Sequence, residues 1–598
     1  MNPDATLNAA RSAFRAGQFT EAARLARDAL RRRPRDADAA SLAGLALLRL
    51  PDLDGALRHL QDAARLRPSE PTFHVNLGIA LLRRGSSADA IAAFDRAIAL
   101  KPDLAPAHFN RANALRGAGD LGAAESGYRR ALDLRPGHAG TLCNLANTLT
   151  DLARVDEALP LYHRALESEP GNLAARNSLG TALLQIGHID EAVAAFEAVL
   201  SSSPTNLEAC TNLGNALKSA GRLEEAASAY DRALRLAPES EVAANGLGNA
   251  LLGQGRIDEA VAAYRRALAI RPDYDTARSN LILALNYAAD LAPAQVVKPA
   301  RVWGARLGAA TSPIVAHHAN PPDPERRLRI GFVSPDFRTH SCAYFLDPLF
   351  QAHDRDACEF FAYAEVPAPD AFTERLQRAC GHWRSTVGRS DADVARQVID
   401  DGIDILVDAA GHTAGNRLSL FARRPAPVQV TWLGYPNTTG LDAIGTRLVD
   451  TATDPEGDTE LDACYAERRL RLPHCFICYA PPDVGAEIGP LPARQSGTIT
   501  FGSFNNLPKM TARVIEVWAG VLRAVPGSRL LLKNRSLTDE ATRDRFRAMF
   551  EAQGVEGERI DNAGWTRGTR EHLETYNRVD IALDTFPYNG TTTTCEAL

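Results

Sequence analysis

The sequence lacks a strong excess of charge of either sign. Lysine and arginine total 67 against 73 aspartate and glutamate residues, which gives a formal net charge of -6 at pH 7 over 598 residues. A chain that binds nucleic acid or an anionic membrane surface as a whole usually carries a clear positive excess. The composition therefore predicts no nucleic-acid partner and no membrane partner.

Cysteines and long apolar runs are also scarce. Nine cysteines are too few and too scattered for a disulfide scaffold, which favours a reducing compartment. The N-terminal sequence MNPDATLNAARSAFRAGQ lacks the basic and apolar regions of a secretory signal. No run reaches the roughly 18 apolar residues of a membrane span. These absences predict a soluble, cytoplasmic protein.

A repeat with a period of 34 residues occupies the first half of the chain. Alanine stands at the same position of each unit, and Phe94, Tyr128 and their equivalents lie opposite small residues, a pattern of closely packed helix pairs. This period and pattern resemble tetratricopeptide repeats, so residues 1–288 are predicted to form a superhelix, an α-solenoid with a long concave face. The period is marked by Pro34, Pro68, Pro102, Pro136, Pro170, Pro204, Pro238 and Pro272.

Asparagines recur on the predicted concave face of this superhelix. They occupy the sixth position of the inner helix at Asn76, Asn110, Asn144, Asn212 and Asn280. An amide offers both a donor and an acceptor, so a row of amides can pair with the backbone of an extended peptide whatever its sequence. The alternative is that each asparagine bonds to a neighbouring helix. The regular spacing favours the binding of protein substrates as extended peptides in the groove.

The second half changes from a helical period to apolar strands. After Asn286 the repeat fails, and the proline-rich residues 289–327 are predicted to be a linker. Continuous apolar strands separated by helices indicate parallel sheets covered on both faces. The proline- and glycine-rich residues 481–497 divide this half into two Rossmann-like α/β units, 328–490 and 491–598, with a ligand cleft at the carboxyl ends of their strands. The expected strands are 328–335, 360–366, 403–411, 428–434, 498–504, 528–534 and 579–586.

Glycine-rich nucleotide-binding loops are missing from this half. Neither a Walker A sequence nor a strand followed by GxGxxG is present, which removes support for an ATPase or a dehydrogenase. Two strands open instead into NNLPK and PYNGTTTTCEAL, where glycine and hydroxyl groups precede a helical pattern. The N-terminus of a helix with free amides and hydroxyl groups attracts phosphate.

Six segments of the second half carry a specific family resemblance. They read SPDFRTHSCAYFLDPL, GHTAGNRL, RRPAPVQVTWLGYPNTTGL, RLPHCFICY, TFGSFNNLPKMT and DIALDTFPYNGTTTTCEAL. They resemble the catalytic region of the O-GlcNAc transferase and SPINDLY family of protein O-glycosyltransferases, which also carries tetratricopeptide repeats. The resemblance implies a GT-B fold, a nucleotide-sugar donor, serine or threonine acceptors in proteins, inversion at the anomeric carbon, and neither a cofactor nor a catalytic metal.

The donor and the activity each have an alternative at this point. Several segments look closer to the SPINDLY branch, which implies GDP-fucose, than to animal O-GlcNAc transferases, which use UDP-N-acetylglucosamine. A function of another class is a non-catalytic scaffold, in which the repeats bind proteins and the α/β half is inert. The family's repeats also hold substrate peptide on groove asparagines, which supports the peptide-binding interpretation given above.

The resemblance assigns donor contacts to five residues. Lys509 follows a strand in a loop that faces the cleft, where its ammonium group would neutralise the leaving diphosphate, and Asn506 stands where the family often has glutamine. Thr592 and Thr593 would add hydrogen bonds to the phosphates, and Glu596 would accept from ribose hydroxyl groups. A surface lysine and a threonine-rich helix cap without a ligand are the alternatives.

Three histidines are further candidates. His572 matches a family histidine that stacks on the nucleobase, with a surface position as the alternative. His340 follows the first strand of this half and would accept or relay the proton of the acceptor hydroxyl. His412, at another strand end, is the weaker catalytic candidate, for which a structural role stays open. No second CxxC accompanies Cys475 and Cys478, so these two are expected to form a buried strand pair without metal.

The C-terminal sequence predicts an incomplete second unit. The chain stops at Leu598 inside CEAL, and only three clear strands lie between residues 498 and 598. A nucleotide-binding half normally has more strands. We therefore expect the chain to be a fragment of a longer protein that binds peptide through its repeats but donor poorly.

Overall fold

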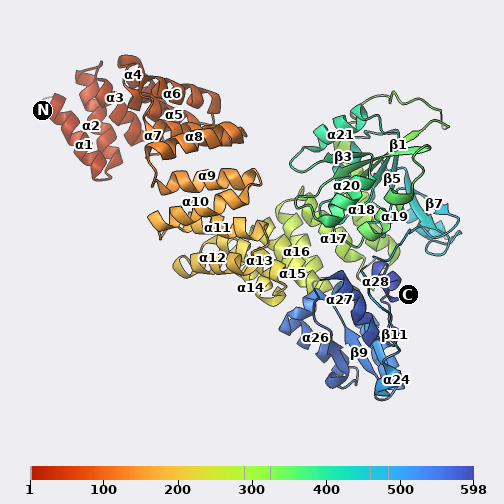
Figure 1. Ribbon diagram of the computed structural model, residues 1–598. Helices are drawn as coiled ribbons and strands as arrows, with labels where there is room; N and C mark the ends of the chain where they lie inside the picture. The colour runs from red at the N-terminus through yellow and green to blue at the C-terminus, as the bar shows by residue number, and fades with distance from the viewer. Residues whose placement is uncertain (1–2, 289, 324, 458, 483, 567) are drawn as a thin grey trace. The chain divides into compact units, whose positions relative to one another are not determined.

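The computed structural model of the chain describes residues 3–288, 290–323, 325–457, 459–482, 484–566 and 568–598 (Figure 1). The chain divides into two compact units, Met1–Ala216 and Leu217–Leu598. The first unit is helical. The second contains four more helices of the repeat, followed by two parallel α/β sheets.

Paired antiparallel helices build the first unit, as the 34-residue period predicts. Tight pairing depends on small residues opposite large ones: a Cβ atom at Gly78 would lie 2.5 Å from the ring of Phe94, which is fully buried. Ala153, at the site where the glycine of the turn is missing, adopts the left-handed conformation with φ of 59°. The helices are α1 Pro3–Arg15, α2 Phe19–Arg32, α3 Ala37–Leu47, α4 Leu53–Leu66, α5 Pro71–Arg83, α6 Ser87–Leu100, α7 Ala105–Gly117, α8 Leu121–Leu134, α9 Ala139–Asp151, α10 Val155–Ser168, α11 Leu173–Gln185, α12 Ile189–Ser202 and α13 Leu207–Ala220.

The second unit begins with the last repeats and with a helix where a linker was predicted. Residues 289 and 324 of that segment lie outside the described residues, but Pro293–Ala310 forms the helix α18, with proline in its first turn. Proline at that position is pre-organised for a helix, so the proline content of the segment was misleading. Trp303 anchors α18, because it is buried and its Nε1 donates to Asp275 Oδ1 of α17 at 3.0 Å. The other helices here are α14 Leu223–Leu236, α15 Glu241–Gly253, α16 Ile257–Ile270 and α17 Asp275–Leu285.

A seven-stranded parallel sheet forms the first α/β region, in the order β3-β2-β1-β4-β5-β6-β7. Four of these strands were expected. The missed strands, HWRS, TRLVD and RRLRL, carry charges because they lie at or next to the edges of the sheet. The strands are β1 Leu328–Ser334, β2 Cys358–Ala364, β3 His382–Ser385, β4 Ile405–Asp408, β5 Val428–Thr431, β6 Thr446–Asp450 and β7 Arg468–Leu472, and the helices are α19 Ala343–Ala352, α20 Ala371–Ala379, α21 Asp391–Asp400, α22 Leu418–Ala422 and α23 Thr459–Cys464.

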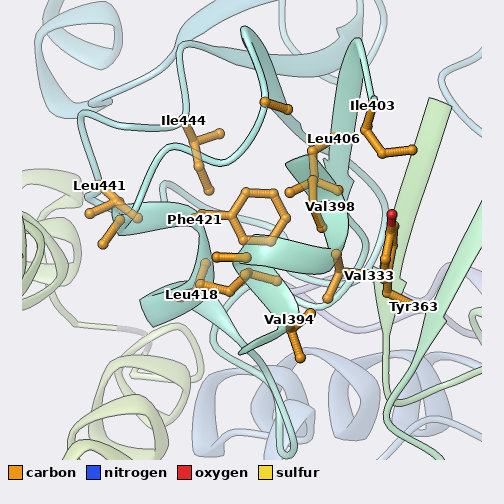
Figure 2. Packing of buried hydrophobic residues seen from close by; sticks show 14 of the residues in the cluster. Val333, Tyr363, Val394, Val398, Ile403, Leu406, Leu418, Phe421, Leu441 and Ile444 are labelled. Atoms are coloured by element: carbon orange, nitrogen blue, oxygen red, sulfur yellow. The ribbon is translucent and has the colours of Figure 1, made fainter. Parts of the chain in front are cut away.

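The apolar core of this sheet extends into the repeats. Figure 2 shows side chains of β1, β2 and β4 packed with Phe421 and with Val394 and Val398 of α21. The same cluster includes Ile282 of α17 and Trp303 of α18. The last repeat and α18 are therefore packed into one core with the first α/β sheet.

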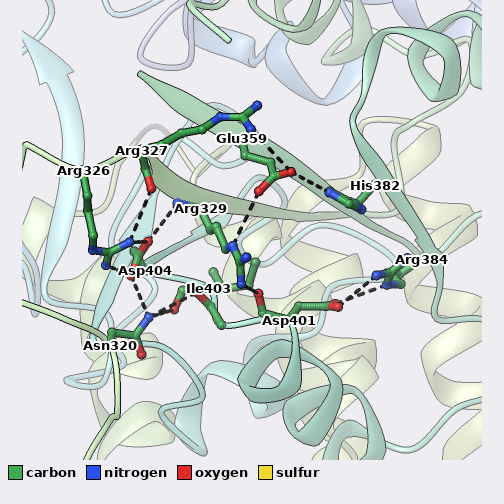
Figure 3. Close-up of polar contacts among 11 residues, drawn as sticks. Asn320, Arg326, Arg327, Arg329, Glu359, His382, Arg384, Asp401, Ile403 and Asp404 are labelled. Atoms are coloured by element: carbon green, nitrogen blue, oxygen red, sulfur yellow. Dashed lines mark hydrogen bonds and ion pairs between the residues drawn. The ribbon is translucent and has the colours of Figure 1, made fainter. Parts of the chain in front are cut away.

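A polar network lies at the amino ends of β1, β2 and β4 (Figure 3). Asp404 accepts hydrogen bonds from the backbone amide of Arg329 at 2.8 Å, from Arg326 and from Asn320 Nδ2 at 2.6 Å. Three donors satisfy this buried carboxylate, as burial of a charge requires. The network fixes the strands on the side remote from their carboxyl ends.

The second sheet is smaller and also parallel, with the order β10-β9-β8-β11. Three of its strands were expected, and β10 was missed because it is only three residues long. Its strands are β8 Thr500–Ser503, β9 Arg529–Leu532, β10 Ile560–Asn562 and β11 Ile581–Ala582, and its helices are α24 Ala493–Ser496, η1 Leu507–Lys509, α25 Ala512–Ala524, η2 Arg535–Thr538, α26 Glu540–Glu551, η3 Gly557–Arg559, α27 Thr569–Glu574, η4 Thr575–Arg578 and α28 Thr592–Ala597.

Candidate functional site

Both sheets have a switch point, where the order of the strands reverses. In the first sheet it lies between β1 and β4, and in the second between β8 and β11. Open α/β sheets bind ligands outside the carboxyl ends of their strands at such points, because the loops there diverge and leave a crevice. His340 and His412 follow β1 and β4, whereas Asn506 and Lys509 follow β8 and the threonine-rich loop follows β11. These predicted site residues therefore follow the strands that flank the two switch points, whereas His572 lies on α27, after β10.

Asp584 joins the two loops of the second switch point. Its carboxylate accepts from Asn505 Nδ2 at 3.0 Å, from the backbone amide of Gly590 at 2.7 Å and from Thr594 Oγ1 at 3.1 Å. Thr593 Oγ1 donates to Asn505 Oδ1 at 3.0 Å, which adds a second link. The loop after β11 is thus held against the loop after β8. Sequence reasoning gave Asp584 no role, although a carboxylate just beyond a strand end is the signal for one.

Lys509 is half-buried beside this loop. Its Nζ donates to the carbonyl of Asn589 at 2.8 Å and lies 4.2 Å from the centre of the Tyr588 ring. Burial lowers the pKa of Lys509 to about 8, and the nearby Asp584 carboxylate opposes that shift. An ammonium group that is short of anionic partners attracts an anionic ligand. Asn506, three residues earlier, is exposed on the same loop.

His572, Glu596 and Tyr576 form a second polar group at this switch point. His572 Nε2 lies 3.0 Å from Glu596 Oε2, and Tyr576 donates from its hydroxyl to the carbonyl of Thr593 at 3.1 Å. Thr592 is buried at the start of α28. The structure therefore brings together the predicted residues of α27 and α28.

Lys533 belongs to this group and was missed from the sequence. Its Nζ contacts His572 Nδ1 and lies 5.6 Å from the Phe504 ring, and its side chain is only 2 % exposed. Burial lowers the pKa of Lys533, whereas Glu596 raises it. The signal was a lysine at the carboxyl end of the apolar strand SRLLLKN. A buried cation between a histidine and aromatic rings adds positive charge to the site.

His340 lies in the loop after β1, next to two further ligand-type side chains. Its Nδ1 lies 3.4 Å from Asp336 Oδ1 and 3.3 Å from the backbone amide nitrogen of Cys342. Burial lowers the pKa of His340, and Asp336 partly offsets this. The imidazole is more than a third exposed, so a hydroxyl group of a ligand can reach it.

His412 occupies a different environment, which argues against the predicted catalytic role. Its Nε2 donates to the carbonyl of Thr439 at 2.9 Å, its Nδ1 lies 3.3 Å from Ser279 Oγ, and the ring is fully buried against Trp303 and Tyr435. Burial lowers its pKa to about 4. The imidazole is neutral, both of its nitrogens have polar partners, and its packing joins α17 to the first sheet. The structural alternative is the one that the geometry supports.

The expectation for the CxxC pair was wrong. Cys475 and Cys478 are exposed and lie outside any strand. Apolar letters around them suggested a strand, but Pro473 and the following residues form an irregular segment after β7. Within the described part of the chain, neither cysteine belongs to a group of three or more ligand-type side chains.

The groove asparagines are half-buried and bonded within the repeats. The amide of Asn110 donates to the carbonyl of Pro106 in its own helix at 2.8 Å. The others bond to a neighbouring helix, which is the alternative that the sequence left open, and peptide binding stays a prediction. Their partners are Ser41 Oγ for Asn76, Asn113 Oδ1 for Asn144, Asn177 Oδ1 for Asn212 and Asn245 Oδ1 for Asn280.

Helical repeats joined to two parallel α/β sheets, with polar loops at both switch points, define the class of protein: a repeat protein with an open α/β region of the kind that binds ligands at its strand ends. No helix in the described ranges is long and apolar enough to cross a membrane. The model of glycosyl transferase family 41 matches residues 309–480, and tetratricopeptide repeat models match five stretches between residues 7 and 275.

Known proteins are similar to this chain in sequence and in structure. A solved O-GlcNAc transferase mutant of Thermobaculum terrenum is 37% identical, with a TM-score of 0.67, over 71% of this chain and 80% of that one. The chain therefore belongs to the O-GlcNAc transferase and SPINDLY family.

Plant relatives match over a shorter share of their length. The probable UDP-N-acetylglucosamine–peptide N-acetylglucosaminyltransferase SPINDLY of Arabidopsis thaliana is 41% identical over 53% of this chain and 35% of its own length. The probable transferase SEC of the same plant is 31% identical over 46% of this chain and 28% of its own length. The chain thus spans about a third of the length of the curated relatives it matches.

Proposed function

We propose that this chain carries the acceptor-binding and donor-binding regions of a protein O-glycosyltransferase. The enzyme transfers a sugar from a nucleotide sugar to a serine or threonine hydroxyl of a protein, with inversion. The observation that carries the proposal is the position of Lys509 and His340 on the switch-point loops of two parallel sheets. Sugar transfer needs a cation for the leaving diphosphate and an acceptor for the hydroxyl proton, and these two residues supply them.

Lys509 acts on the leaving group. Negative charge develops on the diphosphate as the sugar–phosphate bond breaks, and the ammonium group stabilises it in a partly water-excluded site. A pKa of about 8 keeps the lysine mostly protonated at neutral pH, and a bound diphosphate would raise that pKa again because its negative charge favours the ammonium form. Thr592, Thr593 and the loop held by Asp584 supply hydrogen bonds to the same phosphates. His572 and Glu596 bind the nucleoside part.

His340 acts on the acceptor. In the tautomer with its proton on Nδ1, that nitrogen points toward Asp336 Oδ1 at 3.4 Å, and the lone pair of Nε2 takes up or relays the proton of the acceptor hydroxyl. The neutral form that burial favours is the form that can accept a proton. No metal takes part in this step.

The repeats hold the acceptor protein as an extended peptide along their groove asparagines. Asn110 donates to the carbonyl of Pro106 inside its own helix rather than to a neighbouring helix. Asn144 donates across to Asn113 of α7. Loss of the Asn110 amide should therefore affect peptide binding alone, whereas loss of the Asn144 amide should also weaken the packing of neighbouring helices.

The donor is UDP-N-acetylglucosamine or GDP-fucose. Both plant relatives carry UDP-N-acetylglucosamine in their names, and the higher identity is to the SPINDLY protein. A thermal-shift panel of UDP, GDP and the two nucleotide sugars distinguishes them. The matching donor at 100 times its Kd stabilises the protein by about 2.7 kcal/mol, and the other nucleotide gives no shift.

The proposal is tested by replacing Lys509. Lys509→Ala should lower turnover by about 10² or more while the protein stays folded, because one preorganised contact to the transition state is lost. Lys298→Ala, on the exposed side of α18, is the matched control and should keep full turnover. Turnover of Lys509→Ala within a few-fold of the parent chain would remove this lysine from the mechanism. A pure scaffold would give neither transfer nor a donor-dependent shift.

A further inference from the structure

Three metal-ligating side chains converge in the loop after β1. The ligand atoms of Asp336, His340 and Cys342 all lie within 4.8 Å of one another. Among the residues that the structure describes, this is the one group of three or more His, Cys, Asp or Glu side chains with such convergence. The group combines oxygen, nitrogen and sulfur donors over seven residues of chain.

Asp336 gives an independent sign that a cation fits here. Its side chain is 5 % exposed, and its Oδ2 has no hydrogen-bond partner. The nearby thiol of Cys342 and imidazole of His340 face the same carboxylate. A buried carboxylate oxygen without a donor costs free energy, which a cation bound at that oxygen offsets.

The distances suit a small tetrahedral ion. Zinc bonds of about 2.0–2.3 Å place neighbouring ligand atoms about 3.3–3.8 Å apart. The separation of 3.4 Å between His340 Nδ1 and Asp336 Oδ1 already falls in this range, and all three ligand atoms lie within 4.8 Å of one another. Magnesium and calcium prefer oxygen ligands alone, whereas a set with cysteine and histidine selects zinc or a similar transition metal.

We propose that Asp336, His340 and Cys342 bind one zinc ion, which blocks the site. Binding converts the thiol of Cys342 to a thiolate and releases its proton to solvent. His340 coordinates through Nδ1, so its proton resides on Nε2, and that nitrogen loses the lone pair that would accept a proton from the acceptor hydroxyl. The ion acts as an inhibitor, and this part rests on the proposed function of His340, whereas zinc binding itself does not.

Binding is tested on the full chain, freed of metal by a chelator and titrated with zinc chloride or cobalt chloride. We expect one equivalent to bind, with a thiolate-to-cobalt charge-transfer band. Cys342→Ser should remove the band and weaken zinc binding by at least the about 10- to 100-fold that loss of a supporting contact costs. Asp336→Asn should weaken zinc binding and keep the band, because Cys342 is still present. This second variant keeps the test valid if Cys342→Ser fails to fold.

The matched control is the exposed pair, Cys475→Ser with Cys478→Ser, which should leave band and affinity unchanged. If the band persists in Cys342→Ser, or disappears in the control, the assignment of Cys342 as a zinc ligand is refuted. If zinc binds to these ligands while sugar transfer continues unaltered, the inhibitory part is wrong. If the chain transfers no sugar even without zinc, the proposed function fails. The cobalt spectrum still shows whether these three residues bind a metal.

Discussion

Replacing Gly304 by alanine should separate α18 from the first α/β sheet. A Cβ atom at Gly304 would lie 1.8 Å from the carbonyl oxygen of Gly440 and 2.3 Å from its carbonyl carbon. Non-bonded heavy atoms prefer separations of about 3.5 Å, so the helix would have to retreat by about 1.5 Å. Both contacting atoms belong to the backbone, and no side chain can rotate away to relieve the overlap.

The expected loss of stability is the difference between a gain in helix propensity and the cost of the steric overlap. Glycine to alanine inside a helix gains up to about 1 kcal/mol in helix propensity. Overpacking costs about 1–3 kcal/mol, and the retreat also loosens Trp303, which is buried in the core shared by α18 and the sheet. We expect a net destabilisation of about 1–2 kcal/mol, since the overlap is with backbone.

Urea unfolding followed by tryptophan fluorescence measures this effect, and α18 supplies its own control. A Cβ atom at Gly308 would meet nothing within 4 Å, so Gly308→Ala should raise stability slightly through helix propensity alone. The two variants make the same chemical change four residues apart and should shift the unfolding midpoint in opposite directions. A Gly304→Ala protein that unfolds at the same urea concentration as the parent, or a higher one, would refute the close approach of α18.

Two further predictions concern His412 and the groove asparagines. Because the pKa of His412 is about 4 when folded and near 6.5 when unfolded, only the unfolded state takes up a proton between these values. Stability should fall by about 2 kcal/mol from pH ~7.5 to pH ~5, a dependence that His412→Gln should lack in urea titrations. Asn110→Ala should weaken peptide binding in a fluorescence assay with little change in melting temperature, whereas Asn144→Ala should also cost about 1 kcal/mol of stability through its lost interhelical bond. Equal effects of the two substitutions on stability and affinity would contradict this distinction.

The architecture was largely predictable because its main signals are local. The 34-residue period fixes helix pairs, and the buried strands of both sheets are apolar throughout. The errors arose where tertiary packing overrides composition. Proline at residue 293 suggested a linker, but it starts a helix that Trp303 anchors. Edge strands such as β7 carry three charges in RRLRL and do not resemble buried strands.

The positions of the candidate site residues could be predicted better than their environments. Strand order places Lys509 and His340 on switch-point loops, as the sequence suggests. Burial is a property of the packed structure, so the sequence could not separate the enclosed His412 from the accessible His340. Lys533 was missed because a lysine in an apolar run usually reaches solvent, whereas here aromatic rings enclose it.

The shared core of α17, α18 and the first sheet limits how this protein can be divided. Ser279 contacts His412, and Asn286 donates to the Tyr435 hydroxyl at 2.9 Å. A chimera that replaces the repeats up to residue 288 would cut through this core and expose Trp303. The interchangeable module is therefore shorter than the repeat array. The two compact units divide at residue 216, within the last turns of α13, and the helices after α13 should be inherited together with the α/β region as a single block.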